Sequence, residues 1–519
     1  RSTCLTMATW TAQFVLVALF VGTDGTMNLG NAQREVDNTG HGEIRAHSAR
    51  NLERDNQKSG TKRLIRKEVE ATSTEVAADA EEEVPLDFGR RLMQTRHAAM
   101  ASQAQRPSLL QGPGTLEPVE DAWKKSIEML DLYDKNLTYD CSLSYGRQML
   151  KNLLQERNAH HVCQGSNISI TCHERVPFDI SRYTCALKNI SISAEGTSAP
   201  GCKKNAYDSF VESEGIAEKK LFGEWTHLKG IDFSEKPIQC KEMVTGKALV
   251  QIATDTQNFY EWYGDWVTLW ETMAALGWHP KDTDLYLVGM LSGGGREFAR
   301  PFDEAWSRMF RSRLHVGSME QLFGDGTCFR QIYTVPQGSL STLSFHGGRA
   351  GSVPCSSPLV MSSALYLQAL FPPLANASKP SRKHVTVLQR KGGVRAWNSD
   401  VMVVRDIQDM VPDGWGVSGY RPEDYPTFEA QLNVVQHTQV FVGIHGAGMM
   451  HVLFLPPMAR VVEVFCGDRP MMNHHFRNLE EMGEPFVGEH LFHYYFESTL
   501  GRCKVDPKVI KKAVAAYDA

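Results

Sequence analysis

Four consecutive residues, His445-Gly446-Ala447-Gly448, end an apolar run that begins at Val440. An apolar, helix-compatible segment follows them, and a Pro-Pro turn then leads into a second β-branched run. Small residues at such a strand–turn–helix junction let a phosphate approach the backbone, and the first N–H groups of the helix point at an anion. His445 adds a hydrogen-bond donor at the same edge. The pattern predicts a pocket for the diphosphate of a nucleotide. A tight turn that holds no ligand is the alternative interpretation.

Two arginines and one acid are candidates for the same pocket. Arg390 and Arg395 follow an apolar run and flank a Gly-Gly pair. A guanidinium stays charged and can bind a phosphate through two parallel hydrogen bonds. Glu463 lies near the end of the second β-branched run, where nucleotide-binding folds place the acid that holds a ribose hydroxyl. The alternatives are two surface arginines on a turn and a strand-end acid paired with a neighbour.

The segments that must position these residues alternate between strand and helix from Lys247 onward. The predicted strands before Val440 are 247–253, 284–289, 384–389, 402–404 and 416–418. The predicted helices between them are 258–276, 304–310 and 428–437. This alternation is typical of an α/β fold with a parallel sheet. Two such blocks, about 247–375 and 380–490, predict two Rossmann-like halves with a cleft between them, and ligands bind such sheets beyond the carboxyl ends of the strands.

The N-terminal part of the chain has a different composition. Residues 10–21 form a mostly apolar run that is closer to a signal-peptide core than to the roughly 20 residues that span a bilayer. A cleaved signal peptide and a short signal-anchor, which would tether the protein as a single-pass type II membrane protein, both stay open. The polar, aromatic-poor stretch that follows predicts a disordered stem. The predicted segments are therefore 1–21 (signal or anchor), 22–115 (stem), 116–245 (Cys-rich N-terminal segment), 246–380 (first half) and 381–519 (second half).

The cysteines indicate the compartment. The chain has 11 cysteines and none forms a C-x-x-C pair, which disfavours a zinc ribbon or a thioredoxin-type site. Cys4 falls before or within the targeting segment, and the other ten are even in number, which predicts disulfides of undetermined connectivity in the secretory pathway. Sequons agree with this compartment, and they lie at Asn136, Asn167, Asn189 and Asn376.

Composition excludes some partners. Lysine and arginine number 55 against 60 acidic residues, a net charge of −5, so no basic excess points to nucleic acid. With 42% hydrophobic and 22% charged residues the chain is globular in composition, and 519 residues are too many for one ordinary core.

Several motifs, taken in order, make the chain similar to glycosyltransferase family 61 over roughly residues 247–465. They are Asn258-Phe-Tyr-Glu-Trp-Tyr-Gly-Asp265, Thr283-Asp-Leu-Tyr-Leu-Val288, Thr327-Cys-Phe329, Arg390-Lys-Gly-Gly-Val-Arg395 with Asn398, Gln431, and the His-Gly-Ala-Gly block that closes on Glu463. The resemblance implies a GT-B fold, an inverting mechanism, a nucleotide-sugar donor bound by the second half, and a protein or glycan acceptor in the endoplasmic reticulum or Golgi, on the side of the first half. The sugar that it implies first is GlcNAc from UDP-GlcNAc. Xylosyl or arabinosyl transfer to a glycan is the alternative.

The resemblance also implies catalytic roles. An inverting transferase needs a base beside the acceptor hydroxyl, and Asp265 is the first candidate because burial among the tryptophans at 262, 266 and 270 would raise its pKa. The alternative is a helix core in which Asp265 merely caps or pairs. Glu261 is the second candidate, and Asn258 and Tyr260 are expected to shape the acceptor side.

Other functions are less well supported. Asp282-Thr-Asp284 has the spelling of a metal-binding Asp-x-Asp motif but precedes a strand, so we interpret it as a turn and expect no metal or cofactor beyond the UDP-sugar. A serine hydrolase would need a Gly-x-Ser-x-Gly elbow, which the sequence lacks. The family usually carries histidine where this chain has Glu261 and Trp262, which leaves open a different donor or acceptor, or a non-catalytic binding protein of the same fold.

Overall fold

The structure is a computed structural model of the chain. It describes residues 17–21, 27–31, 119–165, 167–174, 183–193, 196–199, 202, 239–253, 258–289, 303–336, 338, 341–343, 355–371, 382–390, 396–466, 474–483, 492–499, 503 and 505–518. Arg395, the sequon at Asn376, Cys4 and all of the predicted stem except 27–31 lie outside these residues. Among the described residues, no helix is both long enough and apolar enough to cross a membrane.

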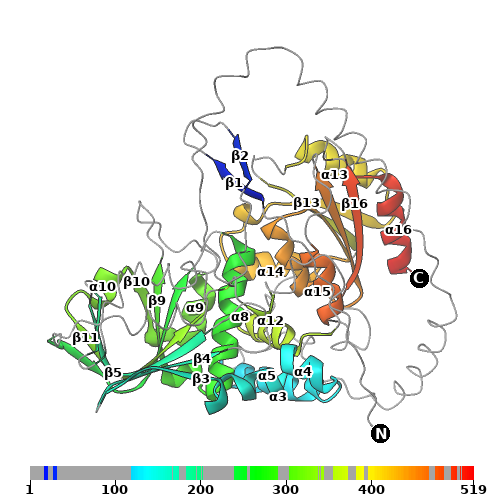
Figure 1. Ribbon diagram of the computed structural model, residues 1–519. Helices are drawn as coiled ribbons and strands as arrows, with labels where there is room; N and C mark the ends of the chain where they lie inside the picture. The colour runs from blue at the N-terminus through cyan, green and yellow to red at the C-terminus, as the bar shows by residue number, and fades with distance from the viewer. Residues whose placement is uncertain are drawn as a thin grey trace, which may run out of the picture. The chain divides into compact units, whose positions relative to one another are not determined.

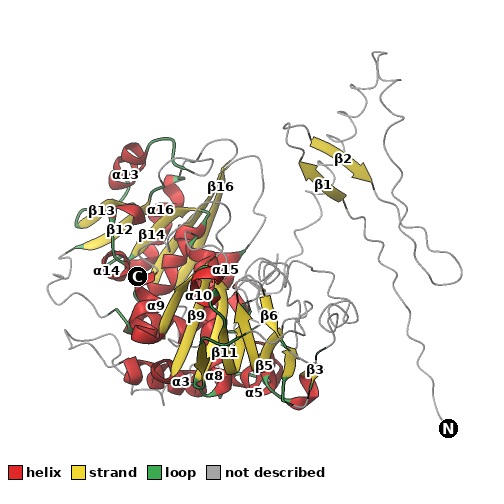
Figure 2. Cartoon of the chain, turned by 90° about the vertical axis from the view of Figure 1, so that its left-hand side faces the viewer, coloured by secondary structure: helices red, strands yellow, loops and turns green. Residues whose placement is uncertain are grey.

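The chain divides into two compact units, Arg1–Ala104 and Gln105–Ala519. In the first unit, β1 (Val17–Val21) pairs antiparallel with β2 (Met27–Asn31). The second unit holds two sheets, and helices flank their strands (Figures 1 and 2). All the candidate site residues belong to this second unit.

The first sheet is mixed, and within the described residues it has nine strands. Its main path runs β10-β9-β8-β11-β5-β4-β3, with β6 beside β5 and β7 beside β11. The parallel part is β7 (Glu242–Val244), β8 (Lys247–Ala253), β9 (Thr283–Gly289), β10 (Leu314–Gly317) and β11 (Thr327–Val335). The antiparallel part is β3 (Ala159–Gln164), β4 (Ser169–Glu174), β5 (Tyr183–Ser193) and β6 (Gly196–Ser198). The strands of the Cys-rich segment thus extend the sheet of the first half.

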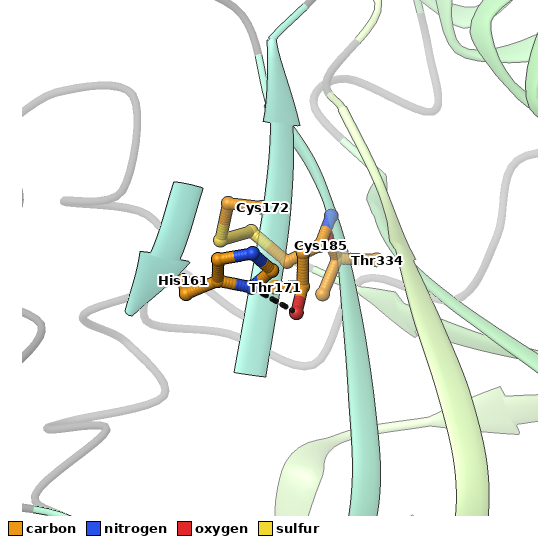
Figure 3. Close-up of a disulfide and its surroundings, with 5 residues drawn as sticks. All are labelled: His161, Thr171, Cys172, Cys185 and Thr334. Carbon is orange, nitrogen blue, oxygen red and sulfur yellow. Dashed lines mark hydrogen bonds between the residues drawn. A yellow bond between two sulfur atoms is a disulfide. The ribbon is translucent and has the colours of Figure 1, made fainter. Parts of the chain in front are cut away.

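Disulfides join neighbouring elements of this sheet. Cys172 and Cys185 lie directly opposite each other on β4 and β5 and form one of them (Figure 3). Beside it, Thr334 Oγ1 on β11 accepts a hydrogen bond of 2.9 Å from the backbone N–H of Cys185. His161 Nδ1 on β3 lies 3.3 Å from the hydroxyl of Thr171. The ladder and the disulfide therefore hold the same strands together.

All ten cysteines after Cys4 are paired, which confirms the predicted disulfides. The connectivity, which the sequence left open, is Cys141–Cys355, Cys163–Cys202, Cys172–Cys185, Cys240–Cys328 and Cys466–Cys503.

The second sheet is entirely parallel, in the order β13-β12-β14-β15-β16. Its strands are β12 (Lys383–Leu388), β13 (Trp415–Tyr420), β14 (Val440–Ile444), β15 (Ala459–Cys466) and β16 (Phe492–Thr499). Every residue of β14 is buried, as expected for a strand covered on both faces. In order along the chain this is a 2-1-3-4-5 sheet, one of the common doubly wound arrangements. The α/β prediction is confirmed, whereas the two Rossmann-like halves and their GT-B arrangement stay predictions.

Helices cover the strands of both sheets (Figure 2). They are α3 (Val119–Asp134), α4 (Tyr139–Tyr145), α5 (Arg147–Leu153), α8 (Phe259–Leu276), α9 (Asp303–Phe310), α10 (Met319–Phe323), α12 (Pro358–Ala369), α13 (Asp400–Gln408), α14 (Phe428–Gln436), α15 (His475–Gly483) and α16 (Pro507–Asp518). Short 3₁₀ turns are η1 (Glu156–Asn158), η3 (Pro280–Asp282), η4 (Arg311–Arg313), η6 (Pro422–Asp424) and η7 (Ala447–Phe454).

One predicted strand is wrong. Residues 402–404 belong to α13 rather than to a strand. The side chain of Ser399 accepts a hydrogen bond from the backbone N–H of Met402 and so caps the helix. Val403 and Ile407, four residues apart, are buried, while Val401 and Met402 are exposed. The apolar residues therefore follow the helical period, which three residues alone could not reveal.

Helix α8 contacts elements that belong to both sheets and their connections. Asn258 caps it, since its side chain accepts from the backbone N–H of Tyr260, and it ends at Gly277 in the left-handed conformation with φ of 62°. The tryptophans at 262, 266 and 270 are buried, which confirms the helix-core interpretation of their spacing. At its first turn the ring of Phe259 lies 4.8 Å from that of His451 on η7 and 5.6 Å from that of Phe428 on α14. The start of α8 therefore packs against η7, which begins within the His-Gly-Ala-Gly turn, and against α14.

Candidate active site

Arg390 and the His-Gly-Ala-Gly turn lie at the switch point of the second sheet. In a 2-1-3-4-5 sheet the connections turn in opposite directions from the first and third strands, here β12 and β14, and ligands bind beyond the carboxyl ends of these two strands. Arg390 follows β12 by two residues, and His445 directly follows β14. Val387 and Val442 are partners in the ladder, so both strands end at the same edge. The sheet thus places Arg390 beside the His-Gly-Ala-Gly turn.

The backbone at Gly446 lies close to the guanidinium of Arg390. Its φ is 157°, and a Cβ built on it would lie 2.6 Å from Nη1 of Arg390, closer than real Cβ contacts. Only a residue without a side chain lets the guanidinium lie this close to the turn. Gly448 has a different neighbour, because a Cβ there would lie 3.1 Å from a methyl group of Leu388. Gly446 therefore leaves room for the guanidinium of Arg390, and Gly448 lets the turn pack closely against Leu388 of β12.

His445 is held by a buried acid. Its Nδ1 lies 2.5 Å from Oε1 of Glu463, whose side chain is only 1% exposed. The hydroxyl of Tyr494 on β16 donates to the other oxygen, Oε2, at 2.5 Å. Burial and the adjacent Glu463 raise the pKa of Tyr494, so its hydroxyl keeps its proton and donates. Both carboxylate oxygens thus accept from protein groups, and Nδ1 of His445 carries the proton that faces Glu463.

Aromatic rings fix the plane of His445. The ring is stacked on Phe465 at 4.9 Å between centroids, and Phe476 on α15 meets it edge-on at 5.8 Å. With Nδ1 engaged by Glu463, the other ring nitrogen, Nε2, faces away from the acid. The imidazole is therefore oriented before any ligand arrives.

Tyr260, predicted on the acceptor side, contacts a histidine of the second half. Its hydroxyl lies 2.8 Å from Nδ1 of His475 on α15, and the two rings are 4.6 Å apart. Burial, together with the nearby His445 and His474, lowers the pKa of His475 to about 4. His475 is thus neutral at physiological pH. Through its contact with Tyr260, it connects the first turn of α8 to α15.

The two candidate bases have different environments. Asp265 is 2% exposed, and its Oδ1 accepts a 2.6 Å hydrogen bond from the backbone N–H of Gly338. A Cβ on Gly264 would lie 2.6 Å from the carbonyl oxygen of Gly338, so the loop is pressed against this turn of α8. Glu261, one turn earlier, is half-buried. The burial predicted for Asp265 is therefore present, and it serves at least to hold the loop at Gly338.

A buried polar layer supports the glycine turn from beneath. His451 Nδ1 lies 2.9 Å from the carbonyl oxygen of Gly448, and its Nε2 lies 3.1 Å from both the hydroxyl of Tyr420 and Oε1 of Gln431. The amide nitrogen of Gln431 donates to the carbonyl oxygens of Pro422 and Tyr425. This layer ties η7 to β13 and α14.

Sequence reasoning missed Tyr494, His475 and His451. Tyr494 lies on a strand after the last motif, and His475 on a helix with no motif of its own. Only the fold brings them to Glu463 and Tyr260. His451 had a detectable signal, because it stands six residues after His445 in an otherwise apolar segment.

Comparison with known proteins fits this geometry. Residues 329–462 match the family model Glycosyltransferase 61. The matched stretch includes Arg390 and the His-Gly-Ala-Gly turn and stops one residue before Glu463, and it confirms the resemblance for this part of the chain. Glu261 and Asp265 lie outside it. No group of three or more His, Cys, Asp or Glu among the described residues is arranged to hold a metal ion.

Curated relatives match over shorter stretches. The chain is 50% identical over 42 residues to the EGF domain-specific O-linked N-acetylglucosamine transferase of Bos taurus, 48% identical over 42 residues to that of Rattus norvegicus, and 31% identical over 91 residues to that of Gallus gallus. These stretches cover 8%, 8% and 17% of the relatives' length and the same shares of this chain. Among solved structures, a flavo di-iron protein mutant from Thermotoga maritima is 9% identical with a TM-score of 0.19 over 69% of this chain and 98% of its own, too low to indicate a shared fold.

Proposed function

We propose that the protein is an inverting glycosyltransferase that moves a sugar from a UDP-sugar to a hydroxyl of a protein in the secretory pathway. The observation that carries the proposal is that Arg390 lies beside Gly446 of the His-Gly-Ala-Gly turn, at the switch point of a parallel sheet. GlcNAc from UDP-GlcNAc is the first choice of sugar because the relatives' names specify it. The five disulfides and the exposed sequons at Asn136, Asn167 and Asn189 support a lumenal site in the Golgi or endoplasmic reticulum.

The donor side stabilises charge. When the acceptor oxygen bonds to the anomeric carbon, the bond from that carbon to the phosphate oxygen breaks, and UDP leaves with the electron pair. The guanidinium of Arg390 and the backbone at Gly446 would bind the diphosphate oxygens as this charge develops, and Nε2 of His445 would donate to them when both ring nitrogens carry a proton. Fixed donors of this kind remove the need for a divalent ion in the proposed mechanism. Because both oxygens of Glu463 accept from protein groups, we assign it to orienting His445 rather than to the ribose.

The acceptor side must take the proton of the attacking hydroxyl. Glu261 and Asp265 are the candidate bases, on successive turns of α8. Since Asp265 is 2% exposed and holds Gly338, the half-buried Glu261 is the better placed of the two to reach an acceptor. A GT-B arrangement would bring the acceptor to this helix from the side of the first half.

The test is release of UDP from a panel of UDP-sugars by the purified protein, with and without EDTA. We expect turnover with UDP-GlcNAc that EDTA does not change. Arg390→Ala should weaken UDP binding by about 10- to 100-fold, the loss of one or two charge-assisted hydrogen bonds. Arg405→Ala, an exposed arginine on α13, is the matched control. Binding of UDP without turnover of any donor would instead identify a non-catalytic protein, and preference for UDP-xylose or UDP-arabinose would identify the alternative transferases.

The same assay separates the candidate bases. Glu261→Gln should abolish transfer and keep UDP binding, and Asp265→Asn should mainly lower the melting temperature through its contact with Gly338. If Glu261→Gln keeps the wild-type rate while a folded Asp265→Asn loses it, Asp265 is the base.

A further inference from the structure

A pocket lies on the first sheet, and none of its lining residues belongs to the candidate active site. It has a volume of about 520 Å³ and includes Lys188 of β5, Lys247 at the start of β8, Trp278 after α8, and Arg330 and Gln331 of β11. Lys247 is the first residue of β8, and Trp278 precedes β9, so the pocket lies at the amino ends of these parallel strands. Substrates of open α/β sheets bind at the opposite, carboxyl edge. The pocket is therefore separate from the proposed transfer site.

The pocket is cationic. Three of its side chains, Lys188, Lys247 and Arg330, are positively charged, and its lining contains no acid. In the part of the chain that the structure describes, none of the three forms an ion pair with an acid. The acid nearest to the adjoining turn at Gly246 is Asp284, and it is already paired with Arg313 at 3.0 Å and with His315 at 3.4 Å. The three cations are thus available to a bound anion.

An indole ring forms part of the wall. Trp278 is half-buried, and the ring of Tyr333 meets it edge-on at 5.2 Å. Gln331 donates to the hydroxyl of Tyr333 at 3.0 Å, which fixes that ring in turn. The ammonium of Lys247 lies 5.7 Å from the centroid of the indole. A held aromatic ring beside cations suits a ligand with an apolar face and a negative group, because the ring packs the one and the cations bind the other.

The strand is distorted at this place. Asn189 has a φ of 52°, in the left-handed region, and ladder pairing is interrupted between Phe329–Ile190 and Gln331–Lys188. Asn189 itself lines the pocket, and its side-chain amide nitrogen, to which a glycan would be attached, donates to the backbone oxygen of Asn167, which does not line the pocket. A glycan on this sequon would thus begin on the side of the pocket that faces Asn167. The irregular backbone exposes Lys188 and Arg330 on neighbouring strands.

We propose that this pocket binds an anionic saccharide, a sugar chain that bears carboxylate or sulfate groups. The pyranose face packs on Trp278, and the acidic groups bind Lys188, Lys247 and Arg330. A fork of guanidinium donors matches a carboxylate or sulfate. A neutral sugar lacks the anion and an acidic peptide lacks the flat C–H face, so both fit less well. The site would hold a glycan on the protein independently of sugar transfer.

The test is isothermal titration of the full chain with four probes: hexagalacturonate, sulfated maltohexaose, maltohexaose and hexaglutamate. We expect at least one of the two acidic saccharides to bind at least tenfold more tightly than maltohexaose and hexaglutamate, and raised salt to weaken binding. The saccharide that binds more tightly identifies carboxylate or sulfate as the preferred group. Binding of neither acidic saccharide, or equal binding of hexaglutamate or maltohexaose, would overturn the proposal.

Variants locate the binding. The double variant Lys188→Gln, Arg330→Gln changes two exposed side chains, so the fold should be kept, and we expect at least tenfold weaker binding of the acidic saccharide. The matched control is Arg405→Gln, Lys508→Gln, which removes the same charges from exposed positions on α13 and α16. Trp278→Phe keeps a smaller ring and should weaken binding by a lesser factor. An equal loss in the test and control pairs would show a general charge effect and reject the pocket. UDP release should be unchanged in the double variant.

Discussion

The most specific contact of the site is the pair formed by His445 and Glu463. A carboxylate can accept from both Nδ1–H of His445 and the hydroxyl of Tyr494, whereas an amide has one oxygen and one donor end. Glu463→Gln can keep the bond to His445 only if its amide nitrogen donates to the hydroxyl of Tyr494, and it removes the negative charge that faces the imidazole. We expect kcat/KM for UDP-sugar turnover to fall about 10- to 100-fold, the usual effect of removing a partner that orients a functional histidine. Tyr494→Phe, which keeps the bond between His445 and Glu463, should cost less. Equal effects of the two variants would contradict this assignment.

The close approach of Gly446 to Arg390 gives a second prediction at the same scale. Gly446→Ala would place a Cβ 2.6 Å from the present position of Nη1, so the guanidinium must move. Because the guanidinium is the end of a flexible side chain, we expect UDP affinity to fall, but less than in Arg390→Ala. A double-mutant cycle is the measurement: if Gly446 acts through Arg390, adding Gly446→Ala to Arg390→Ala should change the Kd little. Additive losses would show that Gly446 acts by itself.

His451 predicts a pH dependence of stability. Burial lowers its pKa to about 4, below the usual value of 6.5 that applies to the unfolded chain. Between these pH values the unfolded state binds a proton that the folded state does not. The stability that neutral His451 contributes is therefore fully present above pH 6.5 and is lost as the pH falls toward 4. The slope is at most about 1.4 kcal/mol per pH unit for this group. Urea unfolding of wild type and His451→Gln at several pH values should show a flatter dependence in the variant. Parallel curves would show that His451 contributes nothing to the pH dependence of stability.

At the scale of elements, the sequence predicted the parts that obey local rules. Strand β8 has its predicted bounds, and α8 begins one residue later than predicted because Asn258 is its cap. Where the apolar run was short, as in 402–404, periodicity could not separate strand from helix. The segment after Gly446 is a 3₁₀ helix rather than an α-helix, a difference that composition does not encode. Local pattern therefore placed the elements well wherever a cap or a long period was present.

Pairing between elements was beyond the sequence. That β4 and β5 of the Cys-rich segment extend the first sheet depends on contacts between residues far apart, such as Cys185 with Thr334. For the site, the motifs predicted Arg390, His445 and Gly446, because the carboxyl ends of parallel strands lie at the same edge of a sheet. Tyr494 and His475 belong to β16 and α15, and no short sequence motif indicates that these two elements lie beside the site.

At the scale of the whole molecule, one disulfide links distant parts of the chain. Cys141 on α4 is bonded to Cys355, just before α12, and closes a loop of 214 residues. The disulfide between Cys172 and Cys185 closes one of 13 residues. The entropy that a cross-link removes from the unfolded chain grows slowly with loop length, to about 5 kcal/mol for the long loop against about 3 kcal/mol for the short one at 25 °C. The Cys141–Cys355 disulfide should therefore contribute more to the free energy of unfolding than the Cys172–Cys185 disulfide does.

The test compares two double variants by urea unfolding: Cys141→Ala, Cys355→Ala and Cys172→Ala, Cys185→Ala. The first removes the bond that holds the N-terminal helices to α12, and the second removes a bond whose strands stay paired through their ladder. We expect the first pair to lose more unfolding free energy. Because Cys172 and Cys185 are buried and Cys141 and Cys355 are only partly so, packing losses act in the opposite direction. A larger loss in the second pair would show that local packing, rather than chain entropy, is what these disulfides contribute.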